Sequence, residues 1–322
     1  MLTLFHIEQG VLRQTVVEGD PVSLPEQTVW IDLFTPSHQD EEAIARLLGI
    51  DIPTHEEMQE IEASSRLYEE DGALVMTMPV LTGTTTDKPE TTAVTFILTA
   101  SCLVTVRYAD PMSFGIFMRR LARQPGLAGN GELALLGLLE QIVDRMADVL
   151  ENTAAVLEAI SHDIFHTPDS PVGSSSLKDM LQRVGRAGDL AAKVKDSLLG
   201  LNRLVLFMGA KNGLRKDAKL RLKTLMRDAN SIAEHGTFLS NKVAFLLDAT
   251  LGMINIEQSG IIKLFTVAAM AFMPPTLIAS IYGMNFRDMP ELDNAWGYPL
   301  ALLLMVLSAV LPLFYFRRKK WL

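Results

Sequence analysis

The N-terminal third of the chain carries short apolar and β-branched runs that are typical of strands. We expect six of these runs to form strands: Leu2–Ile7, Val11–Val17, Val29–Leu33, Leu74–Val80, Ala93–Leu98 and Leu103–Tyr108. After the third run, Ser37 suits the N-cap of a helix over Gln39–Leu48, and Gly49 stands where that helix would end. The mixture of strands and helices predicts an α/β domain over residues 1–125.

The apolar period changes after Glu132. Apolar positions then recur at alternating steps of four and three residues: Leu135, Leu139, Ile142, Met146, Val149, Thr153, Val156 and Ile160. The Pro, Gly and Ser residues of Thr167–Ser175 interrupt this heptad stripe, and a second helix is expected from about Ser176 to Met208. The two helices predict a helical hairpin.

A third helical pattern begins near Lys216 and meets no strong breaker before Tyr282. One stripe of this pattern contains Leu222, Leu225, Ala229, Ile232, Leu239, Val243, Leu246 and Met253. A continuous helix of this length would span roughly 100 Å, which one small domain does not bury. We therefore expect residues 126–260 to form the hairpin and a long stalk helix that further copies of the chain stabilise.

Two stretches near the C-terminus carry no charge. The first lies between Lys263 and Arg287, and the second runs over residues 294–316. Each provides the roughly 20 apolar residues that a membrane-spanning helix needs. Residues 261–322 are therefore expected to form two transmembrane helices joined by a short loop, so that both termini lie on one side of the membrane.

Charge predicts which side that is. Four basic residues follow the second helix: Arg317, Arg318, Lys319 and Lys320. The connecting loop carries three acidic residues and one basic residue: Asp288, Glu291, Asp293 and Arg287. This asymmetry predicts a multi-pass inner-membrane protein with cytoplasmic N- and C-termini. The first ten residues lack the basic start and apolar run of a signal peptide, which agrees with that orientation.

Composition narrows the chemistry. The formal net charge is −9, and the basic run is juxtamembrane, so a nucleic-acid partner is not expected. Cys102 is the only cysteine, which leaves no disulfide framework or thiolate cluster, and we expect a small apolar role for it in a strand. Because no Walker, His-Glu-x-x-His, Gly-x-Ser-x-Gly or dinucleotide motif occurs, we expect neither an enzyme nor an organic cofactor.

Small and polar residues share one face of the first membrane helix and of the turns before it. At helical spacing, this candidate pore-lining face contains Asn255, Ser259, Ile262, Thr266, Ala269, Met273, Thr276 and Ser280. Bulky residues such as Phe272 and Leu277 are expected elsewhere, and Pro274 and Pro275 favour a bend in mid-membrane. A pore lining has this character, but so does ordinary helix packing, so a plain membrane anchor stays open.

A specific motif follows this face. Gly283, Met284 and Asn285 end the helix, and Met-Pro-Glu-Leu over 289–292, Trp-Gly-Tyr-Pro over 296–299 and the terminal basic cluster come after them. At this position and with these flanks, the chain resembles the CorA family of divalent-cation channels. The likeness extends to Val29–Leu33, to the Ile-Glu-Ala-Ser run over 61–64 and to the run over 254–258.

The resemblance implies an α+β fold assembled as a funnel-shaped homopentamer, in which the first membrane helices line the pore. It also implies Mg²⁺ uptake down the electrochemical gradient, often with Co²⁺ and Ni²⁺, and a regulatory role for Mg²⁺ between cytoplasmic domains. The implied selectivity filter is Gly283, Met284 and Asn285. A ring of Asn285 carbonyl oxygens suits this ion, because Mg²⁺ loses its water reluctantly and a neutral ligand does not hold it too long.

Other candidate sites have two interpretations each. Glu291 and Asp293 in the outer loop either raise the cation concentration at the pore mouth or serve solubility. Six acids are candidates for ion sensing, although a solvated acidic face explains each of them without a site: Glu56, Glu57, Glu60, Glu69, Glu70 and Asp71. His162 and His166 beside Asp163 have a spacing that chelates Zn²⁺ or Ni²⁺, but a solvent-exposed helix end explains them as well.

Three functions therefore compete. The first is a Mg²⁺ channel, and the second is a zinc transporter of the ZntB type within the same superfamily. That branch tends to replace the methionine of the triplet, so Met284 favours magnesium. The third is a membrane-anchored structural or signalling protein with a vestigial pore.

Overall fold

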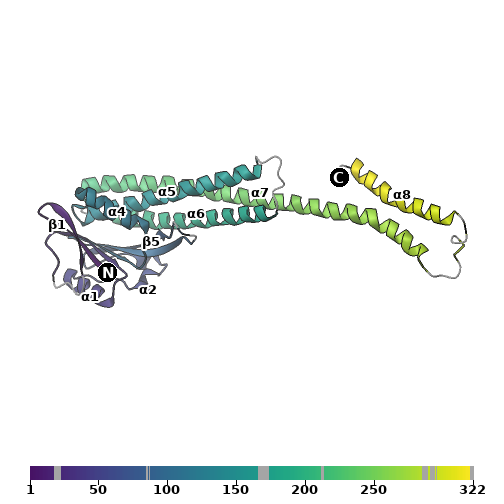
Figure 1. Ribbon diagram of the computed structural model, residues 1–322. Helices are drawn as coiled ribbons and strands as arrows, with labels where there is room; N and C mark the ends of the chain where they lie inside the picture. The colour runs from purple at the N-terminus through teal and green to yellow at the C-terminus, as the bar shows by residue number, and fades with distance from the viewer. Residues whose placement is uncertain are drawn as a thin grey trace. The chain divides into compact units, whose positions relative to one another are not determined.

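In the computed structural model the described residues are 1–17, 23–84, 86, 88–165, 174–211, 214–284, 289–290, 294 and 296–319. The chain divides into two units, residues 1–168 with 182–246, and residues 169–181 with 247–322. Figure 1 shows the order of the elements along the chain.

The first unit contains a seven-stranded mixed sheet in the order β2-β1-β3-β7-β6-β5-β4. Its strands are β1 Leu2–Glu8, β2 Val11–Val17, β3 Thr28–Phe34, β4 Leu67–Glu70, β5 Ala73–Thr82, β6 Glu90–Leu98 and β7 Leu103–Arg107. Strands β3 and β7 are parallel, and the other neighbours are antiparallel. All six predicted strands are confirmed, and β4 is additional.

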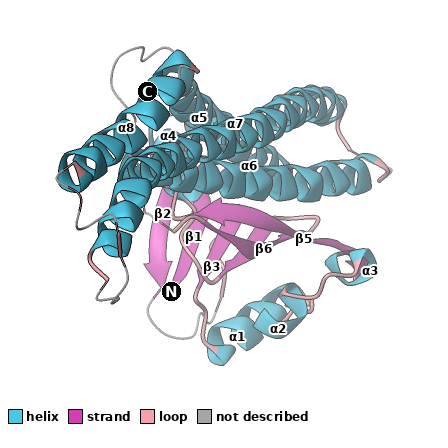
Figure 2. Ribbon diagram, turned by 90° about the vertical axis from the view of Figure 1, so that its right-hand side faces the viewer, coloured by secondary structure: helices cyan, strands magenta, loops and turns pink. Residues whose placement is uncertain are grey.

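Three short helices lie on one side of the sheet (Figure 2). They are α1 His38–Leu48, α2 His55–Met58 and α3 Ala63–Arg66. The predicted cap of α1 is confirmed as a capping box: the Asp40 amide donates to Ser37 Oγ at 3.2 Å, and the Ser37 amide donates to Asp40 Oδ2 at 2.9 Å. Gly49 ends the helix in the left-handed conformation, with φ 63°.

A layer of longer helices covers the opposite face (Figure 2). Its members are α4 Met112–Arg123, a 3₁₀ turn at Pro125–Ala128, α5 Gly131–Phe165, and the parts of α6 Ser174–Gly209 and α7 Lys216–Tyr282 that belong to this unit. An aromatic cluster joins sheet and helices. Trp30 stacks on Phe5 with ring centroids 4.3 Å apart, and Phe114 and Phe117 of α4 pack against Trp30 at 6.3 and 5.7 Å.

The helical hairpin and the long third helix are confirmed, but two details of the predicted stripes are wrong. Val156 is 41% exposed while Leu157 is fully buried, because a straight α-helix drifts away from a strict seven-residue repeat. From Leu222 to Leu246 the α7 stripe is buried by the same chain, except for the half-buried Ile232. This part of the stripe therefore needs no further copy of the chain to cover it.

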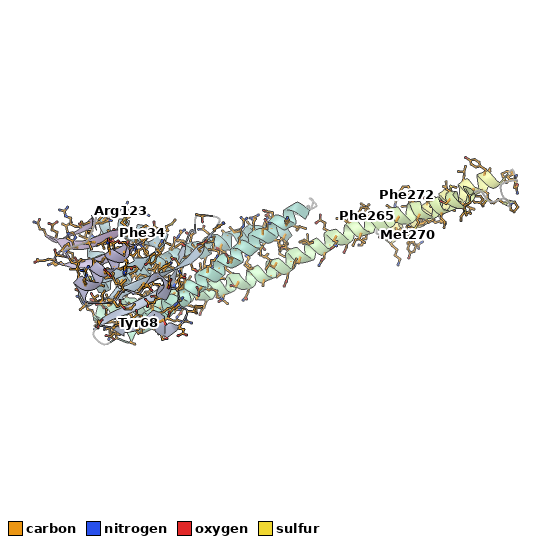
Figure 3. The ribbon with its side chains drawn as sticks, turned by 90° about the horizontal axis from the view of Figure 1, so that it is seen from below. Phe34, Tyr68, Arg123, Phe265, Met270 and Phe272 are labelled. Carbon is orange, nitrogen blue, oxygen red and sulfur yellow. The ribbon has the colours of Figure 1, made fainter. Side chains whose placement is uncertain are left out.

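The second unit contains the two predicted membrane segments. The C-terminal part of α7 and the whole of α8, Gly297–Arg318, are long and apolar enough to cross a membrane, with mean hydropathies of 1.8 and 2.3 in their most apolar windows. Only 6% and 11% of those windows is buried. Phe265, Met270 and Phe272 project outward from α7 in Figure 3 and are at least half exposed. Exposed apolar surface on this scale fits lipid or further protein rather than water.

Candidate ion pathway

Four of the predicted pore-lining residues line one groove on α7. The groove has a volume of about 460 Å³ and is formed by Ala269, Phe272, Met273, Thr276, Leu277 and Ser280. Ala269, Met273, Thr276 and Ser280 follow each other at steps of four and three residues, which keeps them on one helix face. Phe272 and Leu277, which we expected elsewhere, form the edges of this groove, as residues directly beside a central row do.

The predicted face continues toward the start of the membrane segment. Asn255, Ser259 and Ile262 are exposed, and Thr266 is half-buried. The whole face is therefore open along the described helix, apart from the partial cover of Thr266.

Two threonine hydroxyls on this face use their protons inside the helix. Thr266 Oγ1 donates to the Ile262 carbonyl at 2.8 Å, and Thr276 Oγ1 donates to the Phe272 carbonyl at 2.7 Å. A hydroxyl whose proton is engaged still accepts hydrogen bonds through its remaining lone pairs. Since the water molecules around a cation present their hydrogens outward, such oxygens suit a hydrated cation better than an anion.

The mid-membrane prolines lie inside α7. Pro274 and Pro275 lack the amides that would bond the carbonyls of Met270 and Ala271, yet the helix continues through both to Tyr282. The sequence therefore leaves two carbonyl oxygens within this helix without their usual helical donors.

The helix ends at the motif as predicted, because α7 stops at Tyr282. The Gly283 amide donates to the Ala279 carbonyl at 2.9 Å, and the Met284 amide donates to the Ile281 carbonyl at 3.3 Å. Gly283 is not in the left-handed conformation, so conformational freedom is not what requires it here. A Cβ at this position would lie 3.1 Å from the Ala279 carbonyl oxygen, a tight contact that favours glycine at the end of the helix.

The remaining residues of the predicted filter and mouth lie outside the described residues. These are Asn285, Glu291 and Asp293. Met284 is described and is 45% exposed at the end of α7.

Two of the candidate sensing acids have structural partners. Glu57 completes a capping box at α2, where its Oε2 accepts from the Thr54 amide at 2.8 Å. Glu69 pairs with Lys211 at 3.0 Å. Within the described ranges no group of three His, Cys, Asp or Glu side chains is arranged to hold a metal, and His166 lies outside them.

Comparisons with known proteins agree with this architecture. The sequence model of the family described as "CorA-like Mg2+ transporter protein" matches residues 25–318. A magnesium transport protein CorA from Wolinella succinogenes is 35% identical over the full length of both chains. The structure of a CorA magnesium transporter from Methanocaldococcus jannaschii covers 100% of this chain and 99% of its own, with a TM-score of 0.77 at 19% identity.

The fold alone does not separate magnesium from zinc. The cytoplasmic domain of ZntB from Vibrio parahaemolyticus covers 79% of this chain and 97% of its own, with a TM-score of 0.59 at 10% identity. Identity at this level indicates a shared fold, whereas the full-length similarity at 35% identity is to a magnesium transport protein.

Proposed function

Because the chain belongs to the family of CorA-like Mg²⁺ transporter proteins, we propose that it carries Mg²⁺ into the cell through a pore lined by α7. The observation that carries this proposal is the open face of α7, where Ala269, Met273, Thr276 and Ser280 share one groove that leads toward Gly283. Uptake needs no further energy source, since the membrane potential is worth about 4.6 kcal/mol per 100 mV for a divalent cation.

The pore requires several copies of the chain. A groove on one helix is open to the lipid, so only copies that face a common axis enclose a polar path. Phe238 of α7 is 60% exposed before the membrane segment, whereas Phe245, seven residues on, stacks on Phe165 of the same chain. We infer a homopentamer, the assembly that the family resemblance implies, in which exposed apolar surface of this kind is covered.

Selection acts on the hydrated ion in this proposal. Mg²⁺ keeps its octahedral water shell, and a ring of Asn285 amide oxygens accepts hydrogen bonds from those waters without adding charge. Hydrated Co²⁺ and Ni²⁺ are expected to pass as well, because a filter that contacts only the water shell discriminates weakly between octahedral ions. Glu291 and Asp293 raise the local cation concentration at the outer mouth.

Regulation by Mg²⁺ between cytoplasmic domains belongs to the same proposal. The described part of one chain has no metal-holding group of three ligands, so a regulatory ion would draw ligands from two subunits. Four of the six candidate acids are exposed and have no side-chain hydrogen bond or ion pair in the described part of the chain: Glu56, Glu60, Glu70 and Asp71.

The test is ion flux into liposomes that contain the purified full-length protein. A Mg²⁺-sensitive dye and a Zn²⁺-sensitive dye, in matched vesicles with an inside-negative potential, compare the two ions directly. Mg²⁺ entry that depends on the potential supports the proposal. Zn²⁺ entry without Mg²⁺ entry would instead favour the ZntB branch, and entry of neither ion would favour a membrane anchor.

A further inference from the structure

A second groove lies at the C-terminal end of α8. It has a volume of about 640 Å³ and is lined by Val310, Leu313, Phe314 and Arg317. These residues are spaced i, i+3, i+4 and i+7, which places them on one face of the helix. The wall is therefore apolar over about two turns and ends in one guanidinium group. Val310 is 53% and Phe314 66% exposed, so this wall is open.

The cationic end of this groove has no anionic partner among the residues that the structure describes. No Asp or Glu occurs over residues 294–319. Within the part of the chain that the structure describes, Arg317, Arg318 and Lys319 form no ion pair with a carboxylate. The helix C-terminus stabilises their positive charge but provides no anion of its own. The counter-ion must come from outside the described chain.

We propose that this groove binds one anionic phospholipid, with the headgroup phosphate on Arg317 and an acyl chain along Phe314, Leu313 and Val310. The inference rests on the membrane placement of α8 in the proposed function. A guanidinium group binds a phosphate through two parallel hydrogen bonds, and the apolar wall lies on the membrane side of it.

A phospholipid fits better than a free phosphate ion. Three of the four lining residues are apolar, and a small hydrophilic ion would leave their surface uncovered. An acyl chain covers that wall, and an anionic headgroup supplies the missing charge at the depth where an arginine at a helix end lies.

The experiment measures lipid bound to the purified full-length protein by native mass spectrometry. Mixed micelles contain dioleoyl-phosphatidylglycerol or dioleoyl-phosphatidylcholine at equal concentration. We expect tighter binding of phosphatidylglycerol and a loss of more than about tenfold in its affinity on Arg317→Gln, which removes both the charge and the hydrogen bonds to the phosphate. Lys319→Gln is the matched control, since it removes one charge from the same helix end but is not part of the groove, and its effect should be no more than about fivefold.

A second variant separates the groove from surface charge. Val310→Trp fills the apolar wall and leaves every cation in place, so it should also weaken phosphatidylglycerol binding. Equal losses from Arg317→Gln and Lys319→Gln, with no loss from Val310→Trp, would mean diffuse attraction and would overturn the proposal. Efficient competition by soluble glycerol 3-phosphate would show a free-phosphate site, and a crosslink from Arg317→Cys to a second chain would show a subunit contact.

The result is independent of ion transport. If lipid selectivity is absent while the liposomes still take up Mg²⁺, the lipid site is wrong and the proposed function stands. If selective lipid binding is present without Mg²⁺ uptake, the lipid site stands and the proposed function is wrong.

Discussion

Arg107 and Asp32 form a buried ion pair across the parallel strands β7 and β3. The Arg107 guanidinium donates from Nε to Asp32 Oδ1 at 3.1 Å and from Nη2 to Asp32 Oδ2 at 2.9 Å, and the two side chains are 4% and 0% exposed. Thr105 Oγ1 also donates to Asp32 Oδ1 at 2.8 Å, and Arg107 Nη1 donates to Asp110 at 2.7 Å. Every charged group in this network has a partner, so the removal of one partner leaves a buried charge uncompensated.

We expect Asp32→Asn to lower the free energy of unfolding by about 3–5 kcal/mol, because the Arg107 charge stays buried beside a neutral group. Trp30 reports this region directly, since its indole Nε1 donates to Thr105 Oγ1 at 2.9 Å. Urea unfolding followed by fluorescence in a Trp296→Phe, Trp321→Phe background isolates that signal.

The matched control for this ion pair is the exposed Arg13–Glu8 pair at 3.3 Å, whose side chains are 64% and 59% exposed. Glu8→Gln should change the free energy of unfolding by less than about 1 kcal/mol. If Asp32→Asn unfolds at the same urea concentration as Glu8→Gln, the buried pair does not contribute as described.

Two glycines of α6 should respond in opposite directions to alanine. A Cβ on Gly200 would lie 2.7 Å from Pro79 Cδ of β5, whereas a Cβ on Gly185 meets nothing within 4 Å. Gly200→Ala should destabilise the protein by about 1–3 kcal/mol, because helix and sheet must separate. Gly185→Ala should stabilise it by about 0.5–1 kcal/mol through helix propensity. Thermal unfolding by circular dichroism compares the two variants, and a stabilising Gly200→Ala would show that the contact is loose.

The Asp144 carboxyl should make stability depend on pH. Partial desolvation raises its pKa, Arg120 opposes this change, and Glu140, Asp148 and Asp228 raise the pKa further. A carboxyl whose pKa is raised by folding stabilises the protein below its unfolded pKa of about 3.9 and loses that contribution as pH rises through the folded value. Asp144→Asn should therefore increase the thermal midpoint at neutral pH, and the two proteins should converge toward about pH 4. A difference in thermal midpoint between the two proteins that stays constant with pH would exclude titration of Asp144 as its cause.

Much of the fold of the first unit was predictable because each strand carries its own apolar run. Val11–Val17 was predicted to the residue, and the Ser37 cap was identified from residue type alone. Strand β4 was missed because Leu67–Glu70 has only two apolar residues. The Asp71-Gly72 turn after it, with φ 49° and 76°, could have indicated the hairpin, since this dipeptide favours two-residue turns.

The candidate site was predictable only as a helix face. Helical spacing alone placed Ala269 and Ser280 together, because both lie on one continuous helix. The burial of the Leu222–Leu246 stripe depends instead on how the helices of the chain pack, which no local pattern encodes. Val156 was assigned to the wrong face for a different reason, because the drift of a straight helix from a seven-residue repeat accumulates along its length.

The predicted orientation can be tested with single cysteines. Asp293→Cys in the connecting loop should react with a membrane-impermeant maleimide added outside, and Lys320→Cys should react only after the membrane is opened. The native Cys102 gives little background, because it is 1% exposed and burial raises the pKa of its thiol. The opposite labelling pattern would place the large domain outside and would remove the uptake mechanism.

The last prediction concerns the proposed selectivity ring. Asn285→Ala removes one amide oxygen from every subunit at once, so Mg²⁺ flux into liposomes should fall to the level of empty vesicles while the oligomer remains intact. Asn294→Ala is the matched control, because it removes the same side chain from the same loop outside the Gly-Met-Asn motif and should leave flux largely unchanged.

A charged substitution at Asn285 tests whether this residue coordinates the ion or only narrows the pore. Asn285→Asp keeps the shape of the side chain and adds one negative charge per subunit, so a divalent ion should be held more tightly and leave more slowly. We expect slower Mg²⁺ flux, together with a monovalent current that micromolar Mg²⁺ blocks. Size-exclusion chromatography of each variant confirms assembly before flux is compared. Wild-type flux through Asn285→Ala would show that this residue does not select the ion, and the filter would then have to be sought among the groove residues of α7.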